Sequence, residues 1–199
     1  MTFEQELTGF LRADRAAPDL ATYLDRYSGR QFECIDGGGD RDPVKNVITA
    51  ADITAIGTLS VSLKAEAIDE LLFGRTATTA ARALAQIPVS ATIYDSSAAE
   101  LHSGPAAELW HIVKTVPDIG RTKTSKLLAR KRPHLLPIVD SVVAKALGSP
   151  ADFWKPILDA FHAEDVPAAV ADLRQMVGVA PTVSDLRIAD IVVWMAARH

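Results

Sequence analysis

Residues 109–147, LWHIVKTVPDIGRTKTSKLLARKRPHLLPIVDSVVAKAL, carry the densest structural signals in this 199-residue chain. Apolar residues recur at helical spacing through the first eight positions, at Leu109, Ile112, Val113 and Val116. Pro117 and Gly120 then bound a turn, so a second helix is expected to begin near Gly120. After an extended Pro-Ile-Val, Asp140 is a favoured residue for opening a further helix. The stretch therefore predicts a hairpin of two helices followed by an aspartate-capped helix.

The same stretch is strongly basic. Between Lys114 and Arg132 there are seven basic residues and one acid, Asp118, although the whole chain carries a net charge of −4. This asymmetry predicts a basic face on an acidic body, an arrangement that would hold a polyanion in one orientation. The unpaired N–H groups at the start of the second helix suit a phosphate.

The rest of the chain is expected to be helical throughout. With 48% hydrophobic and 23% charged residues, and with apolar residues at helical spacing along most of its length, residues 1–199 predict a single globular all-α domain of nine or ten short helices. A short extended piece at residues 31–35 and one short β-hairpin near the N-terminal third are left open. The triple glycine at 37–39 is interpreted as a flexible surface turn, because no Lys-Ser/Thr follows it as in phosphate-binding loops.

Several classes of protein are excluded by pattern. No apolar run approaches the roughly 18 residues that a membrane span requires, so a cytoplasmic protein without membrane contact is expected. The single cysteine, Cys34, excludes an internal disulfide and a four-cysteine iron–sulfur site. The five histidines show no metal-binding spacing, so no metal and no cofactor are predicted.

The central stretch resembles a known superfamily. VPDIGRTKTSKLL (116–128) resembles the helix-hairpin-helix pattern, and PIVDSVVAKAL (137–147) resembles the segment that follows it in the helix-hairpin-helix-GPD DNA glycosylases. Separately, residues 48–61 (ITAADITAIGTLSV) and 185–198 (DLRIADIVVWMAAR) resemble a bacterial family of unknown function. The first resemblance implies a DNA-binding protein, with duplex DNA and a flipped-out base as the partner.

The glycosylase resemblance also implies roles for individual residues. Asp140 would be the catalytic carboxylate, and the DNA phosphates would be held by Gly120, Arg121, Thr122, Lys123, Lys126 and Arg130. Family members that also cut the DNA backbone carry a lysine two residues after the last hairpin glycine, where this chain has Thr122. A glycosylase with this sequence is therefore expected to be monofunctional. Asp118 departs from the family by replacing the first hairpin glycine.

Two other functions stay open from the sequence. Asp140 has a purely structural explanation as a helix cap, which would leave a DNA-binding module without catalysis. The Arg130-Lys131-Arg132 run is usual at a solvated helix end, which would leave a helical protein-interaction or regulatory domain. The oligomeric state is not predicted.

Overall fold

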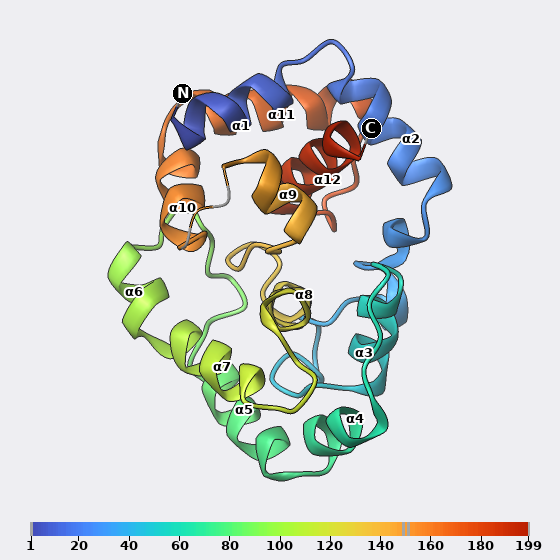
Figure 1. The fold of residues 1–199 in the computed structure, drawn as a ribbon, viewed down its shortest axis with the longest axis vertical. Coiled ribbons are helices and arrows are strands. Elements are labelled where there is room, and N and C mark those ends of the chain that lie inside the picture. The colour runs from blue at the N-terminus through green and yellow to red at the C-terminus, as the bar shows by residue number, and fades with distance from the viewer. Residues whose placement is uncertain (1, 149, 151, 199) are drawn as a thin grey trace.

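The computed structural model describes residues 2–148, 150 and 152–198. Among these residues the secondary structure is entirely helical, with no strand, and Figure 1 shows the helices arranged around a central one, α8. The all-α prediction is confirmed. The α-helices are α1 (Phe3–Leu11), α2 (Ala16–Arg26), α3 (Ala50–Gly57), α4 (Ala65–Leu72), α5 (Arg75–Ala85), α6 (Ala98–Ser103), α7 (Pro105–Lys114), α8 (Arg121–Lys131), α9 (Ser141–Ala146), α10 (Trp154–His162), α11 (Asp165–Val177) and α12 (Asp185–Ala197).

No β-hairpin forms among the described residues of the N-terminal third. Residues 31–35 instead run from the end of one short 3-10 helix, η1 (Ser28–Gln31), through a turn to the start of a second, η2 (Ile35–Gly37). Their backbone carbonyls are used by a side chain from α8: Arg130 donates to the carbonyl oxygens of both Phe32 and Ile35. This segment therefore satisfies its polar groups without pairing as a strand.

Local capping signals fix the starts of several helices. The side chains of Thr2, Thr49 and Ser97 each accept from the backbone N–H three residues later, and the residue at that position bonds back, as in a capping box. Gly178 ends α11 in the left-handed conformation, with φ of 69°. Thr182 and Asp185 have the spacing of a capping box, which predicts Thr182 as the N-cap of the last helix. The N-cap of α12 is instead Ser184, whose side chain accepts from the N–H of Arg187.

The helices form two groups that share one hydrophobic core. Helices α1 and α2 pack against α10, α11 and α12, so both ends of the chain contribute to one group. The second group contains α3 to α7, and α8 packs against α3 and α7. The aromatic stripe at Phe153, Trp154 and Phe161 is buried in this core, as its spacing predicts.

Helix α8 is the most unusual helix of the fold, because it is both highly polar and buried. Every residue from Thr124 to Lys131 is buried, and Arg132 is 1% exposed. The predicted basic face is therefore wrong in large part: Lys126, Arg130, Lys131 and Arg132 point into the protein. A buried cation is tolerated only where it is paired and hydrogen-bonded, and each of these four is hydrogen-bonded.

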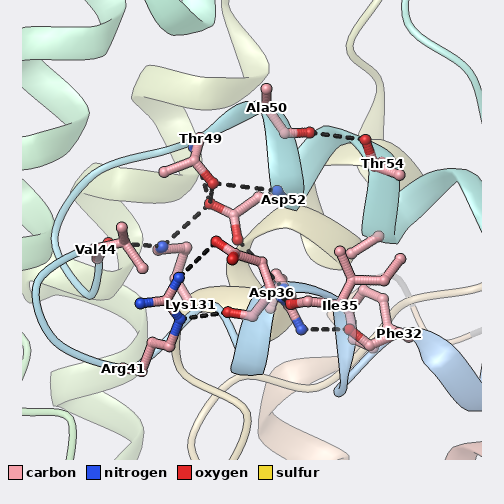
Figure 2. A network of polar contacts seen from close by, with 12 residues as sticks. Phe32, Ile35, Asp36, Arg41, Val44, Thr49, Ala50, Asp52, Thr54 and Lys131 are labelled. Atoms are coloured by element: carbon pink, nitrogen blue, oxygen red, sulfur yellow. Dashed lines mark hydrogen bonds and ion pairs between the residues drawn. The ribbon is translucent and has the colours of Figure 1, made fainter.

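Figure 2 shows how the end of α8 is neutralised. The carboxylate of Asp52, which is 1% exposed, accepts from Lys131 Nζ at 3.1 Å and from Arg130 Nε at 3.3 Å. Lys131 also donates to the carbonyl oxygen of Val44 at 2.9 Å. Arg132 donates to backbone oxygens of Leu84, Lys45 and Ile87. These cations thus tie the loop before α3 and the end of α5 to the central helix.

The triple glycine belongs to this arrangement, which corrects its interpretation as a flexible surface turn. Gly38 and Gly39 are buried, and a Cβ atom on Gly39 would lie 2.5 Å from the Arg130 carbonyl oxygen and 2.7 Å from Asp52 Oδ1. Gly37 and Gly38 have positive φ, which glycine adopts without steric cost. The glycines allow the loop to lie directly on α8.

Candidate functional site

The helical hairpin forms where the sequence predicts it. Helix α7 ends at Lys114, the turn follows, and α8 begins at Arg121 with Gly120 as its N-cap. No side chain among the described residues caps α8. Gly120 is exposed, a Cβ atom there would meet nothing within 4 Å, and the next residue, Arg121, is exposed as well. The first turn of α8 is consequently accessible from solvent.

Asp118 adopts the left-handed conformation of the glycine that it replaces, with φ of 68°. Its carboxylate accepts from Lys123 Nζ at 2.7 Å and from the backbone N–H of Lys64 at 3.3 Å. The hydrogen bond from Lys123 holds the pKa of Asp118 below its usual value. One anion therefore faces two lysines, and with exposed Arg121 the turn keeps a positive balance.

Asp140 caps α9, as predicted, through one carboxylate oxygen, and its other oxygen pairs with a lysine. Its Oδ1 accepts from the N–H of Val142 at 2.9 Å and caps α9. Its Oδ2 accepts from Lys126 Nζ at 3.2 Å, and the same ammonium donates to the carbonyl oxygen of Leu59 at 3.0 Å. Lys126 is 4% exposed. A buried lysine thus fixes the position of the carboxylate and balances its charge.

The Asp140 pocket, as we call it, is a cavity of about 300 Å³ between the two helix groups. It is lined by residues of α2, α8 and α12, by residues 58–61, and by Ile138, Asp140 and Ser141. This volume lies at the lower end of the range for small-molecule sites, about 300–1,000 Å³. Thr122, two residues after the hairpin glycine, lies on the same wall as Lys126, one helical turn later.

One side of the Asp140 pocket is aromatic. The rings of Tyr23 and Tyr27 stack with centroids 5.3 Å apart, and Trp194 packs edge-on against both. The Arg198 guanidinium lies 4.8 Å from the Tyr27 ring centroid and 4.9 Å from that of Trp194. The pocket therefore combines flat apolar surface with a carboxylate, which suits a planar polar ligand.

A buried ionic cluster lies behind the aromatic side. Arg187 donates to Glu33 at 3.0 Å, to Asp190 and to the hydroxyl of Tyr23. Burial raises the pKa of Glu33 and that of Asp190, while Arg187 opposes both shifts. Asp190 Oδ1 is buried and has no hydrogen-bond partner among the described residues. The cluster holds α12 against α2 and shapes the pocket wall.

The structure separates the predicted site residues into three sets. Asp140 and Thr122 line the Asp140 pocket, whereas Gly120, Arg121 and Lys123 lie at the start of α8. Lys126 and Arg130 are 4% and 2% exposed, and both are hydrogen-bonded inside the protein. A phosphate on the surface cannot reach buried side chains, so we leave these two out of the phosphate-binding set.

Sequence reasoning missed most of the pocket wall. Tyr27, Trp194, Arg187 and Asp190 lie far from residues 109–147 in the chain. One signal was present: Arg187 and Asp190 are three residues apart in a helix that is otherwise apolar after its first residue, Asp185, and this is the spacing of a paired charge on one face.

Nearly the whole chain matches a family profile. The profile, described as a family of unknown function, DUF6308, covers residues 16–197. The chain belongs to the DUF6308 family. Comparison with curated proteins and with solved structures found no significant match. Membership confirms the predicted resemblance to a family of unknown function, and the glycosylase resemblance receives no support from these comparisons.

No described helix is long and apolar enough to cross a bilayer.

Proposed function

We propose that this protein binds DNA through the start of α8 and accepts an extrahelical base in the Asp140 pocket. The single observation that carries the proposal is that Asp140 and Thr122 line the same pocket, directly beside the uncapped first turn of the hairpin helix. A carboxylate, a flat aromatic wall and an open helix N-terminus are the three elements that base excision needs. The resemblance of residues 109–147 to the glycosylases points the same way.

The chemistry proposed for Asp140 is hydrolysis of an N-glycosidic bond. As the bond between the base nitrogen and C1′ breaks, positive charge develops on the sugar, and the carboxylate stabilises it. A water molecule gives its hydroxyl group to C1′, and its proton reaches the departing base through Asp140. Lys126 acts on Asp140 as a positioning residue, since its ammonium group lies 3.2 Å from Oδ2.

Asp140→Asn tests the catalytic role without removing the helix cap. Asparagine is as good an N-cap as aspartate, so α9 is expected to persist while the charge is lost. Release of a damaged base from duplex DNA should disappear in this variant, across a panel of lesions. Asp159→Asn is the matched control, because Asp159 is exposed, pairs with Lys155 and does not line the Asp140 pocket. Base release surviving in Asp140→Asn would exclude the mechanism.

DNA binding itself is tested by its dependence on salt. Arg121→Ala with Lys123→Ala should weaken duplex binding and flatten the plot of log affinity against log salt concentration, by about one unit of slope for each phosphate that is no longer bound. Arg12→Ala is a control, because Arg12 is the C-cap of α1 and pairs with exposed Asp165. Unchanged duplex affinity in the double variant would remove the binding claim.

Burial of the basic run favours a second candidate, a helical interaction or regulatory domain. Four of the seven basic residues that suggested a nucleic-acid surface are internal. Wild-type protein that shows no salt-dependent duplex binding would support this candidate. Duplex binding without base release would instead support a DNA-binding module.

A further inference from the structure

A second cavity lies on the other side of the start of α8. It has a volume of about 310 Å³ and is lined by α6, α7, α10 and the first residue of α8. Two pairs of consecutive residues are divided between the cavities. The second cavity is lined by Arg121 and Val139, whereas the residue after each of them, Thr122 and Asp140, lines the Asp140 pocket. In the extended segment before α9, side chains alternate in direction, which explains the second division. We call this cavity the tryptophan pocket.

The tryptophan pocket combines aromatic rings with free cations. The ring centroids of Trp110 and Trp154 lie 5.2 Å apart, and the two ring planes are nearly perpendicular, at 77°. Lys114, one turn after Trp110 on the same face of α7, is exposed, as is Arg121. Neither cation forms a hydrogen bond or ion pair with another described residue. Four other basic residues of this stretch are fully engaged inside the protein, so these two differ from them.

The acid on this wall does not cancel the two cations. Asp152 is already paired with His102 Nε2 at 2.7 Å, and its other oxygen accepts from the N–H of Trp154 at 3.1 Å. Together with the backbone carbonyl of Ala98, Asp152 raises the pKa of His102. The pocket therefore retains a positive balance next to an aromatic surface.

We infer that the tryptophan pocket binds a nucleotide, with its base against Trp110 and its phosphate between Lys114 and Arg121. Aromatic rings beside cations are the usual means of holding unpaired nucleotides, because every base has a face that stacks and every phosphate carries charge. The ligand class is a base bearing a phosphate. It comes either from an unpaired strand next to the DNA site, in which case the inference rests on the proposed function, or from a free nucleotide.

Binding of fluorescein-labelled oligothymidylate, followed by anisotropy, tests this assignment. Trp110→Ala and Lys114→Ala should each weaken binding about tenfold, which is the scale of losing one stacked base or one bound phosphate. Lys155→Ala is the matched control: Lys155 is exposed, pairs with Asp159 and does not line the pocket, so affinity should change less than about twofold. Lys114→Glu, at an exposed position, keeps the test valid if Trp110→Ala does not fold.

The outcomes separate the source of the nucleotide and the fate of the two proposals. Competition by thymidine monophosphate with the same dependence on Trp110 supports a free nucleotide, whereas binding of the oligonucleotide alone supports a strand. Unchanged affinity in the Trp110 and Lys114 variants, an equal loss in Lys155→Ala, or equal competition by inorganic phosphate would overturn the inference. If Asp140→Asn leaves this binding intact while wild-type protein releases no base, only the glycosylase proposal fails.

Discussion

Asp52 is a single buried carboxylate on which two buried cations depend. It accepts from Arg130 and Lys131, and it also closes the capping box at Thr49. Removing one partner of a buried ion pair leaves an uncompensated charge, which costs far more than the pair contributes. The importance of Asp52 therefore lies in what its loss would leave behind.

We predict that Asp52→Asn lowers the free energy of unfolding by about 3–5 kcal/mol, because Arg130 and Lys131 lose their buried anion while the cap is retained. Urea unfolding followed by circular dichroism measures this. Asp159→Asn is the control: its pair with Lys155 is more than half exposed, so a change within about 0.5 kcal/mol is expected. Similar values for the two variants would contradict the structural role of Asp52.

His102 offers a titration that reports on the tryptophan pocket. The carbonyl oxygen of Ala98 and the carboxylate of Asp152 both favour the imidazolium and raise the pKa of His102 above its usual value near 6.5. A raised folded pKa gives a stabilising contribution that is complete below about pH 6.5 and is lost as the pH rises through the folded pKa. Proton NMR should show the pKa falling in Asp152→Asn; an unchanged value would contradict the pairing.

Among the helices, α8 has two ends with opposite environments. Its last turn is buried among carbonyl oxygens and Asp52, whereas its first turn begins at exposed Arg121 and lacks a side-chain cap. The first N–H groups of a helix have no acceptor within the helix, whereas the N–H groups of later turns do. The element is thus anchored at one end and available for contact at the other.

Two glycine variants distinguish these ends. Gly120→Ala should change the free energy of unfolding by no more than about 1 kcal/mol, because its Cβ enters open space at an N-cap. The Gly120→Ala variant should nevertheless weaken duplex binding, since a phosphate would approach through that space.

Gly39→Ala should lower the free energy of unfolding by about 1–3 kcal/mol, because its Cβ meets the Arg130 backbone and Asp52. Thermal unfolding and duplex titration measure both; full duplex affinity in Gly120→Ala would exclude the hairpin contact.

Across the whole molecule, Arg187 joins parts of the chain that are far apart in sequence. It connects α12 to Tyr23 on α2 and to Glu33 in the turn between the two short 3-10 helices. These contacts span 154 and 164 residues of the chain. Because the Asp140 pocket lies between the segments that Arg187 joins, its shape depends on this one guanidinium.

We predict that Arg187→Met destabilises the protein by about 3–5 kcal/mol at neutral pH, since Glu33 and Asp190 stay buried without a cation. Burial already raises the pKa of both carboxyls, and a folded pKa above the unfolded value makes stability rise as the pH falls. The difference in free energy of unfolding between the wild type and Arg187→Met, measured with urea, should therefore become smaller as the pH falls from 7 to 5. Arg12→Met, at an exposed pair, should show neither effect; a deficit that does not vary with pH would contradict the cluster.

Local structure in this protein follows from the sequence alone. The capping boxes at Thr2, Thr49 and Ser97, the cap at Asp140 and the glycine after α11 act within three or four residues, so their pattern is visible in the chain. The helical hairpin and the all-α class follow from such signals together with apolar spacing. The cap of α12 lies two residues after its predicted position.

Which charges face solvent, and where a pocket forms, depends instead on the tertiary structure. Lys126 and Arg130 look like surface cations in sequence, yet their acceptors are Leu59, Asp140, Asp52 and the carbonyls of the turn between the two 3-10 helices. Tyr27 and Trp194 reach the wall of the Asp140 pocket only because α2 packs against α12. A buried charge needs partners, and those of Arg130 lie up to 98 residues away in the chain, so no local pattern encodes their position.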